Sequence, residues 1–307
     1  MSSSSLLWGI DLGGTKMEGT VIAPGKKPQI LSRIRIPTEK QKGYPHILQQ
    51  IADLLHQLHI QTGASPHKIG IGIPGTLEPS TQTIKNANTT LLNGKPFHKD
   101  LVNKLELPVT MANDANCFAL AETKFGIIQQ TAPESTLVFG VIMGTGVGGG
   151  VIVDGKIIGG LQGIAGEWGH NFLDASGGAC YCGKTGCVET VISGPALERF
   201  YQMRSGNKKT LQEIHALYLQ GNDTHAAATV DRLCHFFGKS IAQVINILDP
   251  EYIVLGGGVG NIDALYDKGV TEAKEFVFNH TLETRFLKPA LGDSAGVIGA
   301  AYLTESC

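Results

Sequence analysis

The stretch GIDLGGTKMEGTVI (residues 9–22) places a short apolar run before two adjacent glycines and resumes with strand-forming residues after them. This pattern predicts a β-hairpin over residues 6–22 with a tight, glycine-lined bend. A second stretch, GVIMGTGVGGGVIV (residues 140–153), aligns with the first without gaps, so that Gly9 meets Gly140 and Gly13 meets Gly144. Matching motifs in a constant register predict a chain that arose by internal duplication.

Outward from these two hairpins, helical and strand patterns alternate along the chain, which favours an α/β protein with parallel sheets. Strands are predicted at 69–73, 109–112, 138–142 and 252–255, and helices at 47–58, 117–125, 233–248 and 295–303. We place a domain boundary near Asn113 and expect the last helix to pack back on the first half. The predicted domains are therefore 1–113 plus 290–307, and 114–289.

Composition excludes several classes of protein. The 307 residues carry a formal net charge of −2, so no excess of Lys or Arg is present to neutralise a nucleic-acid backbone. The start, MSSSSLLWGIDLGG, lacks the basic region of a signal peptide, and no apolar run approaches the ~20 residues of a membrane helix. We expect a cytoplasmic protein that binds neither nucleic acid nor membrane.

Three glycine clusters each follow an apolar strand. They are Gly13-Gly14-Thr15, Gly144-Thr145-Gly146 and Gly256-Gly257-Gly258. Glycines let backbone amides approach phosphate oxygens, and hydroxyls such as that of Thr15 add donors, so the clusters predict phosphate-binding loops. Three tight turns without a ligand remain the alternative. The G-x-G-x-x-G match at 144–149 runs into a strand rather than a helix, which argues against a nicotinamide cofactor.

Two aspartates stand at the ends of predicted strands. Asp11 lies at the mouth of the first hairpin, and Asp114 lies between a strand end and a helix start. Such a pair suits phosphoryl transfer, in which one carboxylate organises Mg²⁺ on the phosphates and the other accepts the proton of an attacking hydroxyl. The alternative for Asp114 is a helix N-cap.

One histidine and three cysteines are clustered in a short segment: His170, Cys180, Cys182 and Cys187. This ligand set predicts a closed, structural tetrahedral zinc site. A group of reduced, partly buried thiols is the alternative, since the C-x-C spacing is less standard than C-x-x-C. Glu167 and Glu189 bracket the cluster and could accept hydrogen bonds from vicinal sugar hydroxyls, or could simply be solvated surface residues.

Taken together, the motifs resemble the ROK family of bacterial repressors, open reading frames and sugar kinases. The motifs are DLGGTK, GTGVGGG, GEWGH and CYCGKTGCVE, and the resemblance spans Asp11 to Gly299. It implies an actin-like ATPase (ribonuclease H-like) fold of two α/β domains around a cleft. It also implies a homodimer that transfers the γ-phosphate of ATP to the terminal hydroxyl of a hexose.

The resemblance also assigns residues, with Asp114 as the general base. Nucleotide and Mg²⁺ binding fall to Asp11, Gly13, Gly14, Thr15, Lys16, Gly144, Thr145, Gly146, Gly256, Gly257 and Gly258. Sugar binding falls to Gly75, Asn88, Asn113, Asp114, Glu167, His170 and Glu189. His170 would bind zinc with one ring nitrogen and face a sugar hydroxyl with the other.

Within the family, segments such as KNANTTLLNGKPF and NDANCFALAE resemble the fructokinase/mannokinase branch, so fructose is the predicted acceptor, with mannose or glucose secondary. N-acetylglucosamine kinases and glucokinases are the alternative, and Trp168 favours the fructokinase branch only weakly. Two alternatives of another class are a ROK-type repressor and an inactive zinc-bearing scaffold. The first strand begins at Leu6, which leaves no room for an N-terminal DNA-binding domain, and Asp114 with the glycine loops argues against the scaffold.

Overall fold

A computed structural model gives the fold and describes residues 6–25, 28–87 and 89–305. The chain divides into two compact units, the first drawn from 1–134, 150–165 and 290–307 and the second from 135–149 and 166–289. The predicted domains likewise joined 290–307 to the first half. They placed all of 114–289 in the second domain, whereas this division keeps 114–134 and 150–165 with the first unit.

The first sheet has the strand order β3-β2-β1-β4-β7. Its strands are β1 (Leu7–Leu12), β2 (Lys16–Ala23), β3 (Gln29–Pro37), β4 (Ile69–Ile73) and β7 (Val109–Asn113). β1 and β2 form the predicted antiparallel hairpin, while β4 pairs in parallel with both β1 and β7. The carboxyl ends of β1, β4 and β7 therefore lie at one edge of the sheet, where α/β proteins bind ligands. A small separate hairpin joins β5 (Thr76–Leu77) to β6 (Ile84–Lys85).

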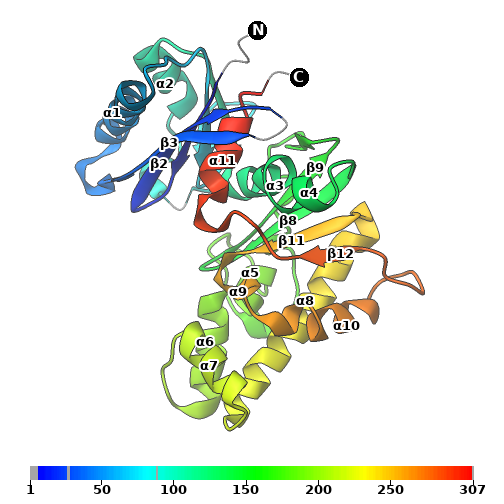
Figure 1. Cartoon of the computed structure of the whole chain (residues 1–307). Coiled ribbons are helices and arrows are strands. Elements are labelled where there is room, and N and C mark those ends of the chain that lie inside the picture. Colours follow the sequence, from blue (N-terminus) through cyan, green and yellow to red (C-terminus); the bar gives the residue numbers. More distant parts are fainter. Residues whose placement is uncertain (1–5, 26–27, 88, 306–307) are drawn as a thin grey trace. The chain divides into compact units, whose positions relative to one another are not determined.

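Helices cover both faces of the first sheet (Figure 1). The helices of the first unit are α1 (Tyr44–Thr62), α2 (Phe97–Leu105), α3 (Asp114–Lys124), α4 (Ile127–Thr131) and α11 (Ala295–Tyr302), with 3-10 turns η1 (Lys40–Lys42), η2 (Thr90–Leu92) and η6 (Gly292–Ser294). α1 buries Ile47, Ile51 and Leu54 at helical spacing and ends at Gly63, whose φ of 66° is left-handed, as a C-cap requires.

The C-terminal helix α11 packs against β1, β4 and α3, on the opposite face from α1. The approach is backbone to backbone. A Cβ at Gly70 would lie 1.8 Å from the carbonyl oxygen of Ala300, and a Cβ at Gly9 would lie 2.3 Å from the amide nitrogen of Ala301. Small residues on both sides are therefore the reason why the last helix fits this face.

The second sheet has the strand order β10-β9-β8-β11-β12. Its strands are β8 (Leu137–Met143), β9 (Val147–Val153), β10 (Lys156–Ile157), β11 (Tyr252–Gly256) and β12 (Arg285–Leu287). β11 pairs in parallel with β8 and with β12, just as β4 pairs with β1 and β7. The two sheets thus repeat one arrangement, in agreement with the duplication predicted from the two glycine-rich stretches.

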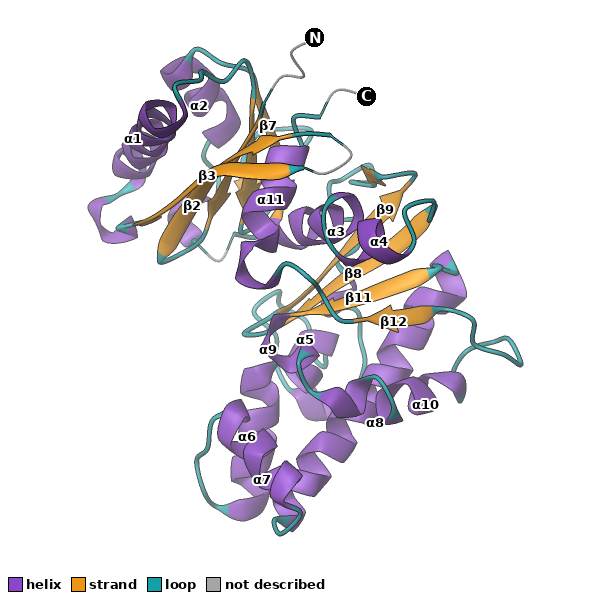
Figure 2. Cartoon of the chain, viewed as in Figure 1, coloured by secondary structure: helices purple, strands orange, loops and turns teal. Residues whose placement is uncertain are grey.

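The second unit is rich in helices (Figure 2). They are α5 (Val188–Ile192), α6 (Gly194–Ser205), α7 (Leu211–Gln220), α8 (Thr224–Leu248), α9 (Gly257–Gly260) and α10 (Lys268–Lys274), with 3-10 turns η3 (Trp168–His170), η4 (Ala175–Gly177) and η5 (Asp263–Leu265). α8 begins well before the predicted Leu233 because Asp223 caps it, accepting from the amides of His225 and Ala226. Phe237 of α8 meets Phe286 of β12 edge to face, with ring centroids 6.0 Å apart. Within the described ranges, no helix combines the length and apolarity needed to span a bilayer.

Candidate functional site

The first glycine loop connects β1 to β2. The amide of Gly13 donates to the carbonyl of Lys16 at 3.0 Å, which closes the bend. Buried Thr38, after β3, braces it twice: its hydroxyl donates to the carbonyl of Gly13 at 2.7 Å, and its amide donates to the carbonyl of Thr15 at 3.0 Å. The side chains of Thr15 and Lys16 are exposed. These hydrogen bonds fix the turn, and its Thr15 hydroxyl and Lys16 amine face solvent. The sequence motifs did not reveal that Thr38 stabilises this loop.

Asp11 lies next to this loop, near the end of β1. A Cβ at Gly72 would come within 3.3 Å of its Oδ1, and one at Gly296 within 2.9 Å of its Oδ2. Burial raises the pKa of Asp11 to about 7, and the charge of Asp114 adds to the rise. The carboxyl therefore sits in a tight, weakly hydrated place where a cation would offset the cost of its charge.

Asp114 is the first residue of α3, and the structure assigns the N-cap to its neighbour. Asn113 has extended backbone angles (φ −63°, ψ 152°), and its side-chain oxygen accepts from the amide of Ala115 at 2.8 Å. Oδ1 of Asp114 also accepts from the amide of Ala115 at 2.8 Å, while the residue as a whole is exposed. Asp114 is consequently not the N-cap, and its carboxylate is accessible from solvent.

Two further candidates for sugar binding lie close to this helix start. The side-chain amide of Asn113 donates to the carbonyl of Gly75 at 3.3 Å, so these two predicted residues are in contact. A Cβ at Gly75 would lie 2.8 Å from the Cα of Ala87, which accounts for the glycine. Asn88 lies outside the described residues.

The second glycine loop, Gly144–Gly146, connects β8 to β9 and is held by α5. The carboxylate of Glu189 accepts from the amide of Val147 at 3.0 Å, and a Cβ at Gly146 would lie 2.5 Å from the same oxygen. The amide of Gly194 donates to the carbonyl of Gly144 at 2.9 Å. The contact that the structure gives Glu189 is therefore with the backbone beside a predicted phosphate loop, although the sequence placed Glu189 among the sugar ligands.

The third glycine cluster follows β11 and begins the short helix α9, which the sequence patterns did not predict. Gly257 has a left-handed φ of 79°, and a Cβ on it would lie 2.3 Å from the carbonyl oxygen of Met143. Met143 immediately precedes Gly144. The second and third clusters are thus neighbours at the carboxyl ends of β8 and β11, as parallel pairing of those strands requires.

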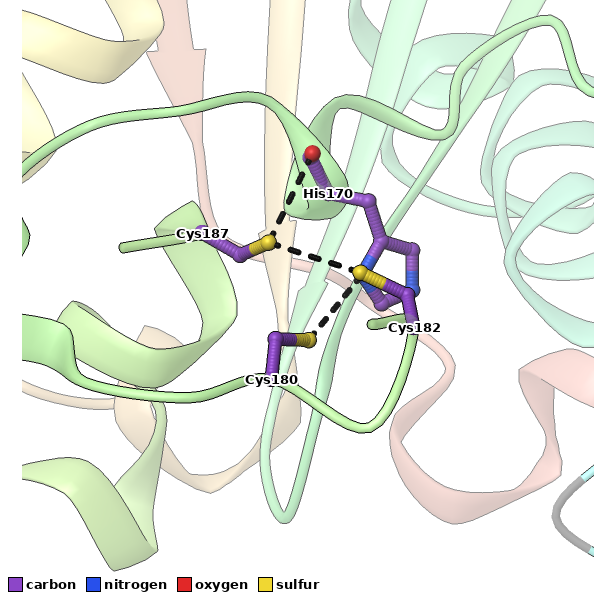
Figure 3. A group of neighbouring side chains, drawn as sticks. All are labelled: His170, Cys180, Cys182 and Cys187. Carbon is purple, nitrogen blue, oxygen red and sulfur yellow. Dashed lines mark hydrogen bonds between the residues drawn. The ribbon is translucent and has the colours of Figure 1, made fainter. Parts of the chain in front are cut away.

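The predicted metal ligands come together in the second unit (Figure 3). The ligand atoms of His170, Cys180, Cys182 and Cys187 all lie within 4.8 Å of one another. Cys180 Sγ is 3.6 Å from His170 Nδ1, and Cys182 Sγ is 3.6 Å from Cys187 Sγ. Ligands of a tetrahedral zinc ion are separated by roughly 3.8 Å when each Zn–S bond is about 2.3 Å. The donor set and spacing therefore fit one tetrahedral ion.

Tyr181, between two of these cysteines, was not singled out by sequence reasoning. Its hydroxyl lies 3.0 Å from Nε2 of His170, the nitrogen that faces away from Cys180. Loss of hydration raises the pKa of Tyr181 to about 12, and Glu189 and Glu167 add to the rise, which places the phenol near both carboxylates. The sequence predicted a sugar hydroxyl at the second nitrogen of His170, and the structure shows a tyrosine hydroxyl there. The position of Tyr181 between two predicted metal ligands is the sequence feature that could have indicated its contact with His170.

Trp168 anchors the loop that carries the predicted sugar ligands Glu167 and His170. It is buried, its indole nitrogen donates to the carbonyl of Gly148 at 3.1 Å, and its ring meets Phe139 of β8 edge to face. The tryptophan that the sequence analysis weighed as a branch marker therefore serves to dock η3 on the second sheet.

A family model described as ROK family matches residues 7–306. The chain belongs to the ROK family. Two curated relatives are the N-acetyl-D-glucosamine kinases of Vibrio cholerae, 32% identical, and Shigella boydii, 34% identical, each aligned over 97% of this chain and 99% of its own length.

Solved structures agree with this assignment. A ROK hexokinase from Thermus thermophilus superposes with a TM-score of 0.85 at 30% identity, over 96% of each chain. A ROK glucokinase from Streptomyces griseus, solved with glucose and AMPPNP, superposes with a TM-score of 0.78 at 26% identity, over 97% of this chain and 99% of that one. The predicted actin-like ATPase fold is confirmed.

A ROK transcriptional regulator shares the fold as well, with a TM-score of 0.81 at 23% identity over 96% of this chain and 76% of that one. The fold alone does not distinguish an enzyme from a regulator, so the function has to be inferred from the residues of the site.

Proposed function

We propose that this ROK protein is an ATP-dependent sugar kinase that phosphorylates the 6-hydroxyl of a hexose, with N-acetylglucosamine as the principal acceptor. The names of the curated relatives support this acceptor. The observation that carries the kinase proposal is the pair of aspartates in the first unit: Asp114 is exposed, and its charge acts on half-buried Asp11 beside the glycine loop.

In this proposal Asp114 is the general base. Its carboxylate accepts the proton of the sugar hydroxyl as that oxygen attacks, while Asn113 holds the helix start. The residues proposed to bind the sugar are Gly75, Asn88, Asn113, Glu167, His170 and Glu189, of which Asn88 lies outside the described residues.

Asp11 and the glycine loops hold the nucleotide. The poorly hydrated carboxylate of Asp11 fits a role beside a divalent cation, because a cation offsets the cost of its charge. When bound, Mg²⁺-ATP supplies the transferred phosphoryl group and the charge that neutralises it. Gly13, Gly14, Thr15 and Lys16 act on the phosphates from the first loop. Gly144, Thr145 and Gly146 do so from the second, with Gly256, Gly257 and Gly258 nearer the adenosine.

The ion held by His170, Cys180, Cys182 and Cys187 is proposed to be structural Zn²⁺. Four protein ligands leave no open position for catalysis. Its task is then mechanical: it fixes the loop between η3 and α5, and with it the orientation of the His170 ring.

The acceptor is tested by measuring ADP release with N-acetylglucosamine, N-acetylmannosamine, glucose, mannose and fructose. We expect the highest kcat/KM with N-acetylglucosamine. The sequence segments that resemble the fructokinase/mannokinase branch make fructose the second candidate. A higher kcat/KM for fructose would replace the acceptor but keep the kinase, whereas no ADP release with any hexose would refute both.

The base is tested by Asp114→Ala, with Asn113→Ala for comparison. Losing the base lowers kcat by about 10²–10⁴-fold, with sugar binding and thermal stability nearly unchanged. Losing the cap costs about 0.5–2 kcal/mol of stability. Retention of a tenth of the wild-type kcat by Asp114→Ala would contradict the assignment. Light scattering during size-exclusion chromatography tests the predicted homodimer in the same preparations.

A further inference from the structure

The space beside Gly14 in the first glycine loop is bordered by two side chains that belong to no glycine motif. A Cβ at Gly14 would lie 3.4 Å from Oγ1 of Thr89 and 4.0 Å from Nζ of Lys40. Gly14 has no side chain, so no Cβ stands between this part of the loop backbone and the hydroxyl and ammonium groups. Both groups come from the first unit, and neither has a role in the proposal above.

Thr89 brings a buried hydroxyl to this space. The residue is 2% exposed, and no hydrogen-bond partner of its Oγ1 is found among the described residues. Buried hydroxyls in native proteins are nearly always hydrogen-bonded, because an unsatisfied one is destabilising. A ligand with an acceptor oxygen at this position would satisfy it.

Lys40 is held beside the loop by its own segment. Thr38 makes two hydrogen bonds to the loop, and Glu39 then takes a left-handed φ of 50°, which turns the chain into η1. The flexible side chain of Lys40 starts from this fixed point. Its backbone position therefore depends on the same contacts that shape the glycine loop.

The nearest carboxylate in sequence does not neutralise Lys40. Glu39 is engaged by Lys42 at 2.8 Å, by His46 at 2.8 Å and by Gln50 at 3.3 Å. Within the part of the chain that the structure describes, no ion pair of Lys40 is found. Its positive charge is therefore available to an anion in the space beside Gly14.

We propose that Lys40 Nζ and Thr89 Oγ1 form a subsite for the terminal phosphoryl group of the nucleotide. A tetrahedral phosphate offers several acceptor oxygens, so one can take the hydroxyl of Thr89 while another meets the ammonium group. The inference rests on the proposed kinase function and adds two binding residues to it. They act together with the backbone of Gly13 and Gly14, although each comes from a separate, later segment of the chain.

The charge is tested by Lys40→Met, with Lys42→Met as the matched control from the same turn. Calorimetric titration with Mg²⁺-ATP should show affinity reduced by about 10- to 100-fold in Lys40→Met and less than about twofold in Lys42→Met. AMP, measured by competition, should bind both variants as it binds wild type. Equal ATP affinity in the two variants, or an equal loss for AMP, would overturn the proposal.

The hydroxyl is tested by Thr89→Val, which keeps the shape of the side chain. If Oγ1 serves a ligand, the unliganded variant is at least as thermally stable as wild type, and Mg²⁺-ATP binds about 3- to 10-fold more weakly. A less stable unliganded protein with unchanged ATP affinity would show a structural role instead and refute the subsite.

These titrations separate the subsite from the kinase proposal. If wild type binds no ATP, the proposed function has failed. If wild type binds ATP and phosphorylates a sugar but Lys40→Met binds it as tightly, only the subsite has failed.

Discussion

Two adjacent residues at the start of α3, Asn113 and Asp114, have different roles. The sequence alone did not decide which of them is the N-cap. A strand-to-helix turn ending in Asn-Asp could use either side chain as the cap. The backbone decides, because Asn113 keeps extended angles and Asp114 is already the first residue of α3. Asp114 can then be substituted without removing the N-cap, so its effect on turnover can be measured apart from stability.

Asp11 leads to a prediction about pH. Its pKa is about 7 in the folded chain and near 3.8 when unfolded, so the folded state binds the proton more tightly. Stability from this group is therefore lost as pH rises from 3.8 to 7, and the loss is complete above 7. Asp11→Asn removes the buried charge, and should stabilise the protein on the order of 1–3 kcal/mol at pH 8 and less at pH 5, while abolishing activity.

Thermal unfolding without nucleotide or Mg²⁺ at the two pH values measures this difference. Asp53→Asn, an exposed change on α1, is the control and should shift neither. A stability gain for Asp11→Asn that is the same at pH 5 and pH 8 would contradict the raised pKa.

Among the elements, α5 links the loop that carries the proposed metal ligands to the second glycine loop. It begins directly after Cys187, and its second residue, Glu189, binds the amide of Val147. A change in the cysteine loop can therefore reach the loop Gly144–Gly146 through one short helix. This connection depends on contacts between segments far apart in the sequence, which no local pattern encodes.

Glu189 can be tested for this positioning role. Glu189→Ala loses the acceptor for the amide of Val147 and should raise the KM for ATP by about 5- to 20-fold. Glu189→Gln keeps an acceptor oxygen and should leave the KM for ATP within about threefold of wild type. If both variants change only the KM for the sugar, Glu189 is a sugar ligand without a part in shaping the loop.

The next prediction concerns loss of the proposed zinc ion from the loop between η3 and α5. Cys182→Ser should lose about one zinc per chain, because three ligands hold the ion far more weakly than four. The loop between η3 and α5 should then be cut faster by proteases, and thermal stability should fall. Elemental analysis and limited proteolysis measure both effects, with Cys234→Ala, outside the cluster, as control. A metal-free wild-type protein with full activity would refute the zinc proposal.

At the scale of the whole molecule, α11 brings the C-terminal end of the chain back to the N-terminal sheet. The last helix returns to the first unit and meets β1, β4 and α3 at backbone distance. A Cβ at Gly299 would lie 1.8 Å from the carbonyl oxygen of Cys117, in the helix that begins with Asp114. The packing that completes the first unit therefore also supports the segment that carries the proposed base.

Gly299→Ala should accordingly destabilise the protein by about 2–4 kcal/mol, because the methyl group can be placed only by moving backbone. Urea unfolding measures the change. Gly159→Ala is the matched control, since nothing lies within 4 Å of a Cβ there and its φ is not left-handed. A loss for Gly299→Ala no larger than that of the control would show that α11 is not held as closely as described.

Local patterns predicted much of this architecture. The β1–β2 hairpin, β4, β7, α1 and α11 all lie where apolar periodicity and glycine signals placed them, because each has its full pattern within one segment. The short α9 was missed, since three glycines predict a turn as readily as a helix start. The beginning of α8 was missed because small or polar residues, Ala226 and Thr229, fill the buried positions of its first turns, where later turns have large apolar ones.

The residue types and spacings of the sequence by themselves indicated the family, the positions of the glycine loops and the four residues that are proposed as metal ligands. Only the tertiary structure decided which side chain caps α3, why the pKa of Asp11 is raised, and that Thr38, Lys40 and Thr89 stand around the first glycine loop. The reason is physical: motifs are short-range properties of the chain, whereas burial and close approach arise where segments distant in sequence pack together.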